Sequence, residues 1–159
     1  MRVRILCVGG VRGPLAPAVQ EFESRAGRYW RLDVTEVEAG VKKGQKGEKE
    51  AVLQAEGERL RARVQDGRSE VVALTRTGKG MASRELAKLL EDCALRSVPE
   101  VCFLIGGAYG LSRDLLRGAP KQLSLSSLTL PHEMARLVLA EQLYRAGTIL
   151  RNEPYHKGV

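Results

Sequence analysis

Aromatic residues, cysteines and long apolar runs are all scarce in this sequence. Aromatic residues are only 4% of the 159 residues, which disfavours a broad base-stacking platform of the kind that single-strand binders use. The cysteines, Cys7, Cys93 and Cys102, are far apart and form no C-x-x-C pair. The sequence therefore indicates neither a structural zinc site nor a thioredoxin-type redox motif, and we expect buried free thiols in a reducing compartment.

Neither a membrane segment nor a metal site is evident in the sequence. No apolar run reaches the ~18 residues that a spanning helix needs. The N-terminal segment MRVRILCVGG is too short to hold the apolar core of a signal peptide. No cluster of metal-ligating side chains stands out. We therefore expect a cytoplasmic protein with no membrane partner and no metal.

Positive charge is in excess along the chain. The sequence has 26 Lys and Arg against 19 Asp and Glu, a formal net charge of +7 and a pI near 9.6. This excess favours a polyanionic partner, with nucleic acid as the first candidate, although a merely soluble basic protein would show it too. The length fits one domain of the usual ~100–200 residues, and we expect residues 1–159 to form a single domain.

Strand-like and helix-like segments alternate along the chain. The predicted strands are residues 2–8, 32–37, 70–75, 100–105 and 121–125. The predicted helices are residues 14–29, 48–65, 83–96 with Ser83 as the N-cap, 112–117 and 131–146. Residues 39–47 and 76–80 are basic, glycine-containing segments that we expect to be loops. This order predicts an α/β fold with a mainly parallel sheet and helices on both faces, in which the apolar strand 100–105 is buried on both sides.

Two glycine-rich turns follow predicted strands. Residues 8–13 precede a helix, as a phosphate-binding loop would, but they lack the G-x-G-x-x-G order and the acidic residue that binds ribose. A nucleotide-triphosphatase is therefore disfavoured. Gly106-Gly107-x-x-Gly110 ends the most apolar strand, at the edge where open α/β sheets bind ligands. A ligand site and a plain tight turn both remain open for it.

The C-terminal half carries a distinctive set of segments. They are residues 72–74 (VAL) before the loop 77–79, residues 103–112 (FLIGGAYGLS), 124–132 (SLSSLTLPH), 141–146 (EQLYRA) and 152–157 (NEPYHK). In order and spacing they resemble the SPOUT superfamily of knotted RNA methyltransferases, and in particular its small single-domain branch, the RlmH type. The resemblance is strong over residues 71–157, whereas the N-terminal half agrees in length and element order.

The resemblance implies a fold, an activity and a cofactor. It implies an α/β domain with a C-terminal trefoil knot, acting as a homodimer. It also implies methylation of nitrogen 3 of a pseudouridine in large-subunit (23S) ribosomal RNA, on assembled ribosomes, with S-adenosylmethionine as donor. The cofactor site that it implies consists of Leu74, Gly106, Gly107, Gly110, Leu125, Ser126, Ser127, Leu128, Thr129 and Leu130. Members often carry an acidic residue where this chain has Ala108-Tyr109.

The chemistry needs few groups besides the cofactor. Methyl transfer from a sulfonium is a displacement that requires positioning and desolvation, while the ring nitrogen must lose its proton to a base or be stabilised by a cation. With the resemblance, we expect Arg145 on the last helix and Tyr155 and His156 in an ordered tail to do this. In a dimer, that tail would complete the partner's pocket. Arg145 needs either Glu141 at i−4 or an RNA phosphate as partner. We expect His132 to cap or pack.

Basic loops and an apolar helix suggest the remaining contacts. The residues expected to hold RNA are Lys42, Lys43, Lys46, Arg76 and Lys79, with ordinary solvated charge as the alternative. The last helix is apolar on most sides, through Met134, Leu137, Val138, Leu139 and Leu143, which suggests a dimer face. Two other functions stay open: a non-catalytic ribosome-binding protein of the same fold, and a nucleotide-binding enzyme that uses Gly9-Gly10 and Gly106-Gly107.

Overall fold

A computed structural model of the chain describes residues 1–41, 48–65 and 67–156. The strands are β1 (Arg2–Val8), β2 (Arg31–Val37), β3 (Ser69–Gly80), β4 (Glu100–Ile105) and β5 (Lys121–Ser124). The helices are α1 (Ala16–Ala26), α2 (Lys49–Arg61), α3 (Ser83–Leu95), α4 (Arg113–Gly118) and α5 (His132–Leu150), with short 3-10 turns η1 (Gly13–Leu15) and η2 (Pro154–His156).

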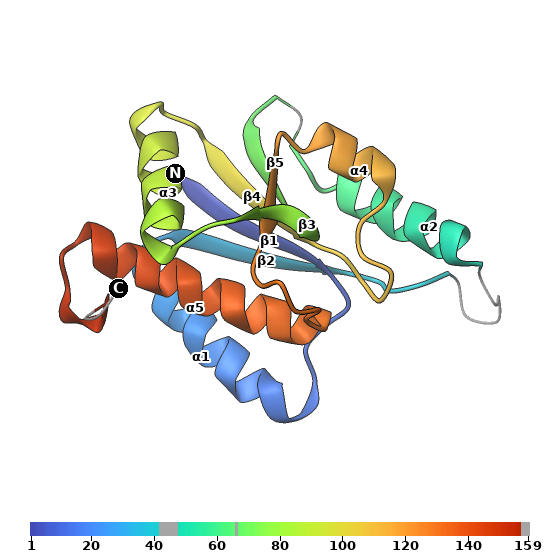
Figure 1. The fold of residues 1–159 in the computed structure, drawn as a ribbon, viewed down its shortest axis with the longest axis horizontal. Helices are drawn as coiled ribbons and strands as arrows, with labels where there is room; N and C mark the ends of the chain where they lie inside the picture. Colours follow the sequence, from blue (N-terminus) through green and yellow to red (C-terminus); the bar gives the residue numbers. More distant parts are fainter. Residues whose placement is uncertain (42–47, 66, 157–159) are drawn as a thin grey trace.

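The strands form one five-stranded sheet in the order β2-β1-β4-β3-β5 (Figure 1). Every neighbouring pair is parallel, which confirms the predicted α/β class. Strand β4 lies between β1 and β3, and all six of its residues are buried. The prediction that this apolar strand is covered on both faces is therefore correct.

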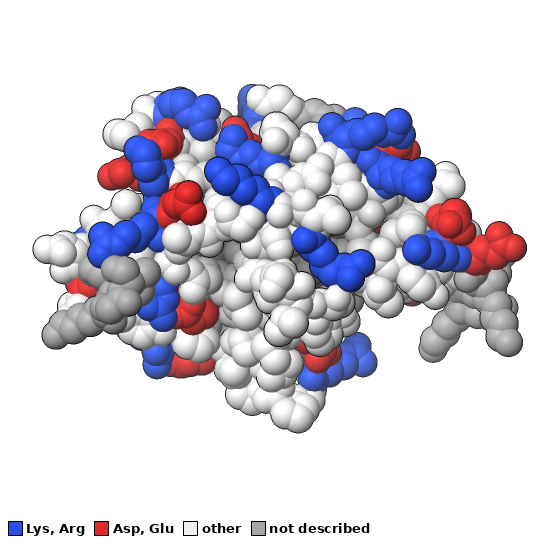
Figure 2. All heavy atoms as spheres, in the orientation of Figure 1, with Lys and Arg blue, Asp and Glu red and all other residues white. Residues whose placement is uncertain are grey.

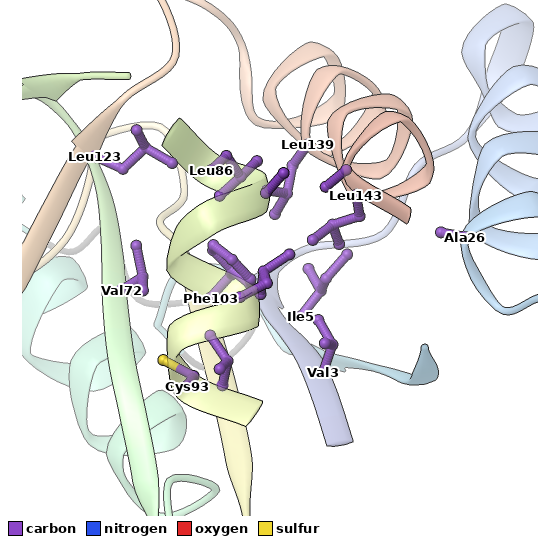
Figure 3. Packing of buried hydrophobic residues seen from close by; sticks show 14 of the residues in the cluster. Val3, Ile5, Ala26, Val72, Leu86, Cys93, Phe103, Leu123, Leu139 and Leu143 are labelled. Carbon is purple, nitrogen blue, oxygen red and sulfur yellow. The ribbon is translucent and has the colours of Figure 1, made fainter. Parts of the chain in front are cut away.

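Helices cover both faces of the sheet. Alternate side chains of a strand point to opposite faces, so Phe103 packs with Leu90 of α3 and Leu143 of α5, whereas Leu104 packs with Leu60 of α2 on the other side. Figure 3 shows the first of these layers, in which strand residues meet α3, α5 and α1. The two layers leave the C-terminal edge of the sheet to the loops.

The segment 76–80, predicted as a loop, is instead the end of β3. Lys79 pairs with Leu123 and Gly80 with Ser124 of β5, after an irregularity that follows Leu74. A Cβ on Gly78 would lie only 2.7 Å from the carbonyl carbons of Gln122 and Leu123. The glycine thus permits a close backbone approach, and its low strand propensity is what made the segment look like a loop.

The N-cap of α3 is Ala82 and not Ser83 as predicted. The Glu85 side chain accepts a hydrogen bond from the Ala82 N–H at 2.7 Å, and this satisfies the helix end without a capping hydroxyl. The Ser83 hydroxyl bonds instead to Gln142 Oε1 at 2.6 Å. Its role is therefore to join α3 to α5.

Helix ends also differ from the predictions. Helix α1 is shorter than predicted, because η1 precedes it and it ends at Ala26, and α2 ends at Arg61. Helix α5 continues past Ala146 to Leu150. A Cβ on Gly147 would lie 2.3 Å from Cγ of Tyr29, so this glycine is a packing contact inside the helix, whereas in the sequence it resembles a stop signal.

Cys7, Cys93 and Cys102 are free and buried, as predicted. Burial raises the pKa of Cys7 to about 11 and that of Cys102 to about 12. Within residues 1–41, 48–65 and 67–156, no helix is long and apolar enough to cross a membrane. The same residues hold no group of three or more His, Cys, Asp or Glu side chains that could bind a metal ion.

Candidate functional site

A pocket of about 560 Å³ opens where residues 74–77 of β3 meet the C-terminal ends of β4 and β5. Nine of the ten residues predicted for the cofactor line it together: Leu74, Gly106, Gly107, Gly110, Leu125, Ser126, Leu128, Thr129 and Leu130. Ser127 is exposed and is not part of the lining. Parallel strands end at one edge of a sheet, which is why segments far apart in the sequence meet here.

The loop after β5 is held by its own hydroxyl groups. Ser124 Oγ donates to the carbonyl of Ser126 at 2.9 Å, and Ser126 Oγ accepts from the N–H of Leu128 at 2.9 Å. Such short-range bonds fix an irregular backbone without a helix or a strand. The serine-rich composition therefore shapes one wall of the pocket.

The loop after β4 is a tight turn and a pocket wall at once. The Gly110 N–H donates to the Gly107 carbonyl at 3.0 Å, and Gly110 has φ +81°, which favours glycine. A Cβ on Gly106 would lie 2.3 Å from the carbonyl carbon of Gly110. The tight turn is confirmed, because it packs on itself. Its glycines also line the pocket, and the ligand site stays a prediction.

Glu56 of α2 lies behind this turn, and the sequence did not reveal it. The side chain is buried, with a relative exposure of 4%. Its Oε1 accepts from the Gly40 N–H at 2.7 Å, while Oε2 has no partner among the described residues. A Cβ on Gly107 would lie 2.8 Å from that oxygen. Gly57 is a sign in the sequence that this part of α2 is closely packed, because the missing side chain lets α2 approach Ser112.

Cationic and polar side chains form the rim of the pocket. Arg76 is exposed and its Nη1 donates to Thr129 Oγ1 at 3.1 Å. Lys49 and His132 also line the pocket. Helix α5 has Pro131 as N-cap, and the His132 ring packs against Gly9, where an added Cβ would lie 3.3 Å from Nε2. Of the capping and packing roles expected for His132, the structure shows the packing role.

Arg136, one turn after His132, fixes the start of α5. Its Nε donates to Glu23 at 2.6 Å and its Nη1 to Glu36 at 2.5 Å. Burial lowers the pKa of Arg136, but the hydrogen bonds to both carboxylates outweigh this and raise it overall. A Cβ on Gly10 would lie 2.6 Å from Glu36 Oε2, so the glycine turn after β1 makes room for this cluster.

The predicted catalytic residues lie at the other end of α5. Arg145 donates to Glu141 Oε1 from Nε at 3.0 Å and from Nη2 at 2.5 Å. Of the two partners expected for Arg145, Glu141 and an RNA phosphate, the structure shows Glu141. Tyr155 donates to the same oxygen at 3.1 Å and lies 4.8 Å below the guanidinium of Arg145. His156 ends η2, but its side chain, like Lys42, Lys43 and Lys46, lies outside what the structure describes.

Aromatic rings dock the tail onto α1 and α5. The Tyr144 ring lies 4.5 Å from Tyr155, 5.7 Å from Tyr29 and 6.3 Å from Phe22, between ring centroids. The Tyr29 hydroxyl donates to Glu153. Burial and the Glu141 carboxylate raise the pKa of Tyr155. The hydrogen bond to Glu141 raises the pKa of Arg145, so Arg145 stays charged.

One chain does not bring the tail to the pocket. Arg145 is 13 residues beyond His132 on α5, so at about 1.5 Å per residue they lie roughly 20 Å apart along the axis. The chain thus holds a cofactor-sized pocket and a cationic, aromatic cluster at opposite ends of one helix.

Comparison with known proteins identifies the family. Residues 1–156 match a family model described as "Predicted SPOUT methyltransferase". The chain belongs to the SPOUT methyltransferase family. A protein named Ribosomal RNA large subunit methyltransferase H from Syntrophotalea carbinolica is 45% identical over 98% of this chain and 99% of its own length. The protein of that name from Gemmatimonas aurantiaca is 46% identical over 99% and 100%.

Solved SPOUT-like structures agree with the fold. A probable methyltransferase from Bordetella pertussis has a TM-score of 0.56 at 17% identity, over 91% of this chain and 95% of its own. A putative methyltransferase from Legionella pneumophila, solved with bound SAM, has a TM-score of 0.50 at 14% identity, over 92% and 66%. At these identities the likeness concerns the fold alone. The resemblance noted in the sequence, and with it the SPOUT-like α/β class, is confirmed.

Proposed function

We propose that the protein is an S-adenosylmethionine-dependent methyltransferase acting on nitrogen 3 of a pseudouridine in large-subunit ribosomal RNA, on assembled ribosomes. The observation that carries the proposal is the pocket in which residues 74–77 of β3 meet the loops after β4 and β5. The chain's membership of the SPOUT family and the two relatives named for large-subunit RNA methylation support ribosomal RNA as the substrate.

The pocket fits the cofactor in size and in chemistry. Its volume lies within the ~300–1,000 Å³ usual for small-molecule sites. Leu74, Leu125 and Leu130 offer apolar surface for an adenine ring, and the glycine turn exposes backbone. The carboxyl of Glu56, buried behind Gly107, supports the glycine turn from α2. When bound, S-adenosylmethionine supplies an already activated methyl group.

Arg145 and Tyr155 are proposed to handle the charge on the target base. Removal of the ring proton leaves an anion, which a positioned guanidinium stabilises. The pKa of Tyr155 is raised, so at neutral pH its hydroxyl donates a hydrogen bond and does not accept the proton. We propose His156 as the third group of this tail. Glu141 holds Arg145 and Tyr155 in place until substrate arrives.

A homodimer would bring the tail to the pocket. The outer face of α5 carries Met134, Leu137, Val138, Glu141 and Arg145, none of them fully buried, and at 100° per residue these positions share one side. Figure 2 shows few charged side chains over the pocket-side half of α5. Two such faces packed antiparallel place Arg145 of one protomer beside His132 of the other.

The proposal covers the whole chain. We propose that residues 1–159 act as one domain in the cytoplasm, where ribosomes are, with no metal and no membrane partner. Arg76 and Lys49 at the rim are exposed, so they are placed to meet RNA phosphates, and Lys79 follows on the same strand.

A methylation assay tests the activity. Purified protein is incubated with labelled S-adenosylmethionine and either 70S ribosomes, free large subunits or deproteinised RNA, all lacking the modification. We expect label in one pseudouridine of assembled particles and little in bare RNA. Ribosome binding without cofactor binding or methyl transfer would favour the non-catalytic reading and overturn the proposal.

Subunit mixing tests the shared site. Ser126→Trp fills the pocket, and Arg145→Gln removes the charge while keeping a hydrogen bond to Glu141. Each variant alone is expected to be inactive. When the two variants are refolded together in equal amounts, half of the dimers are mixed, and each mixed dimer holds one complete site of two. About a quarter of wild-type activity should therefore return. No recovery would mean that Arg145 acts within its own chain.

A further inference from the structure

Tyr109 is the aromatic residue of this chain that packing leaves unexplained. The sequence has seven aromatic residues: Phe22, Tyr29, Trp30, Phe103, Tyr109, Tyr144 and Tyr155. Phe103 is fully buried, and Trp30 donates to the Leu143 carbonyl at 2.8 Å. The other four besides Tyr109 form the ring cluster around Tyr144. Within the described residues Tyr109 has no ring contact and no hydrogen bond, and it is 50% exposed.

The backbone holds Tyr109 at the mouth of the pocket. It is the third residue of the turn that the Gly110 N–H closes onto the Gly107 carbonyl at 3.0 Å. Gly106 packs against the backbone of Gly110, where a Cβ would lie 2.3 Å away. The backbone of the turn therefore has little conformational freedom. Because it is already ordered, little of its conformational entropy is lost when a ligand binds to the ring.

The surroundings of Tyr109 suit a nucleotide. Leu128 lines the same pocket and is 73% exposed. Lys49 and Arg76 line it as well, and both are exposed. An exposed ring, an exposed apolar side chain and two cations on the lining of one pocket provide a stacking surface for a base and charges for its phosphates.

We infer that Tyr109 stacks on a nucleobase of the RNA substrate at the entrance of the pocket and thereby determines substrate affinity. This inference rests on the proposed function, since it requires an RNA substrate. The leucines deeper in the pocket, Leu74, Leu125 and Leu130, are half-buried and suit the cofactor. The half-exposed ring at the rim faces what arrives from outside.

Two substitutions separate the ring from its hydroxyl. Tyr109→Leu removes the aromatic face, whereas Tyr109→Phe keeps it. Methylation kinetics on ribosomes, and cofactor affinity by calorimetry, are measured for both variants and for the wild type. Leu95→Ala on α3, which shortens a side chain that is 78% exposed away from the pocket, is the matched control for loss of exposed apolar surface.

We expect Tyr109→Leu to raise the KM for ribosomes about tenfold or more, the usual size of a lost base–aromatic stack, with cofactor affinity unchanged. Tyr109→Phe and Leu95→Ala should stay within about twofold of wild type. An unchanged KM in Tyr109→Leu would overturn the inference, as would a loss of cofactor affinity instead, or an equal defect in Tyr109→Phe. A wild type that methylates nothing would reject the proposed function itself.

Discussion

The two ends of helix α5 differ in how far their polar and aromatic groups are satisfied by the chain itself. At the C-terminal end, Glu141, Arg145, Tyr144 and Tyr155 bond and stack with one another. At the N-terminal end, the pocket rim exposes Tyr109, and a buried oxygen nearby has no partner among the described residues. The exposed ring at the pocket rim is free to contact a ligand, whereas the cluster at the other end is prearranged by its own contacts.

The comparison suggests a division of work along one helix. The pocket end is the proposed cofactor site, and it is supported by Arg136 at the start of α5 and by Glu56 behind Gly107. The tail end presents a cation that is already oriented by Glu141. A helix spaces the two functions rigidly, so their meeting requires a second copy of the helix.

The largest effect is expected from breaking the support of the pocket end. Arg136→Met leaves the carboxylates of Glu23 and Glu36 without their cation, and we expect a loss of about 2–4 kcal/mol in unfolding free energy, below the maximum for buried pairs because Glu36 is half exposed. Lys88 on α3 forms an exposed ion pair with Asp92. Lys88→Met should therefore lower the free energy of unfolding by less than about 0.5 kcal/mol. Urea unfolding measures both. Equal losses would mean that the Arg136 cluster has no structural role.

A smaller effect should distinguish the glycine turn from other turns. Gly110 and Gly67 have φ of +81° and +70°, with open space where a Cβ would go, so alanine strains both by about 1–2 kcal/mol. Only Gly110 lines the pocket. We expect Gly110→Ala to weaken S-adenosylmethionine binding about tenfold and Gly67→Ala to leave it unchanged, by calorimetry. Similar affinities in both variants would place the cofactor elsewhere.

The tail end should show a pH-dependent contribution of about 1 kcal/mol from Tyr29. A hydrogen bond to Glu153 raises the pKa of Tyr29 from 10 to about 12. Because the folded pKa lies above the unfolded one, the stabilisation is complete below pH 10 and disappears as the pH rises through 12. The stability difference between wild type and Tyr29→Phe, followed by denaturant unfolding, should shrink over that window. A constant difference would contradict the bond.

The smallest effect is expected from thiol reagents. Burial raises the pKa of Cys7 and Cys102, and Cys93 is fully buried as well, so the native protein should react negligibly at pH 8, whereas the unfolded chain should react at all three thiols. Cys7 lies 3.6 Å from Arg136. In Arg136→Met we therefore expect Cys7 to react before the others. Equal reactivity of the three thiols in Arg136→Met would show that the substitution does not expose Cys7 more than the other two.

Sequence patterns were sufficient for the sheet and for the cofactor loops. Continuous apolar runs mark β1 and β4, and the glycine-rich and serine-rich loops after two strand-like runs indicated one shared ligand site. Leu74 was added to that site by the family resemblance alone. Family resemblance supplied the residue roles. Composition and periodicity alone left a ligand site and a plain turn equally open at Gly106.

The misses share a physical cause, which is contact between segments distant in sequence. Gly78 and Gly147 look like breaks, yet each lies where another segment packs closely on the backbone. Glu56 looks like surface charge on an amphipathic helix, yet it is buried behind Gly107. Local propensity carries no information on such tertiary contacts. The proposed antiparallel packing of two α5 helices likewise depends on contacts that one chain does not contain.

The sheet order has a consequence for how the chain acquires its shape during synthesis. Strand β1 lies between β2 and β4, with Arg2 opposite Glu100, so β1 waits for a partner strand that is made nearly a hundred residues later. Loop closure over such distances is slow, and an unpaired apolar strand edge attracts other chains. A nascent chain that ends before residue 100 therefore leaves one backbone edge of β1 unpaired. The face of β1 that carries Val3, Ile5 and Cys7 is covered later still, when α5 has been made.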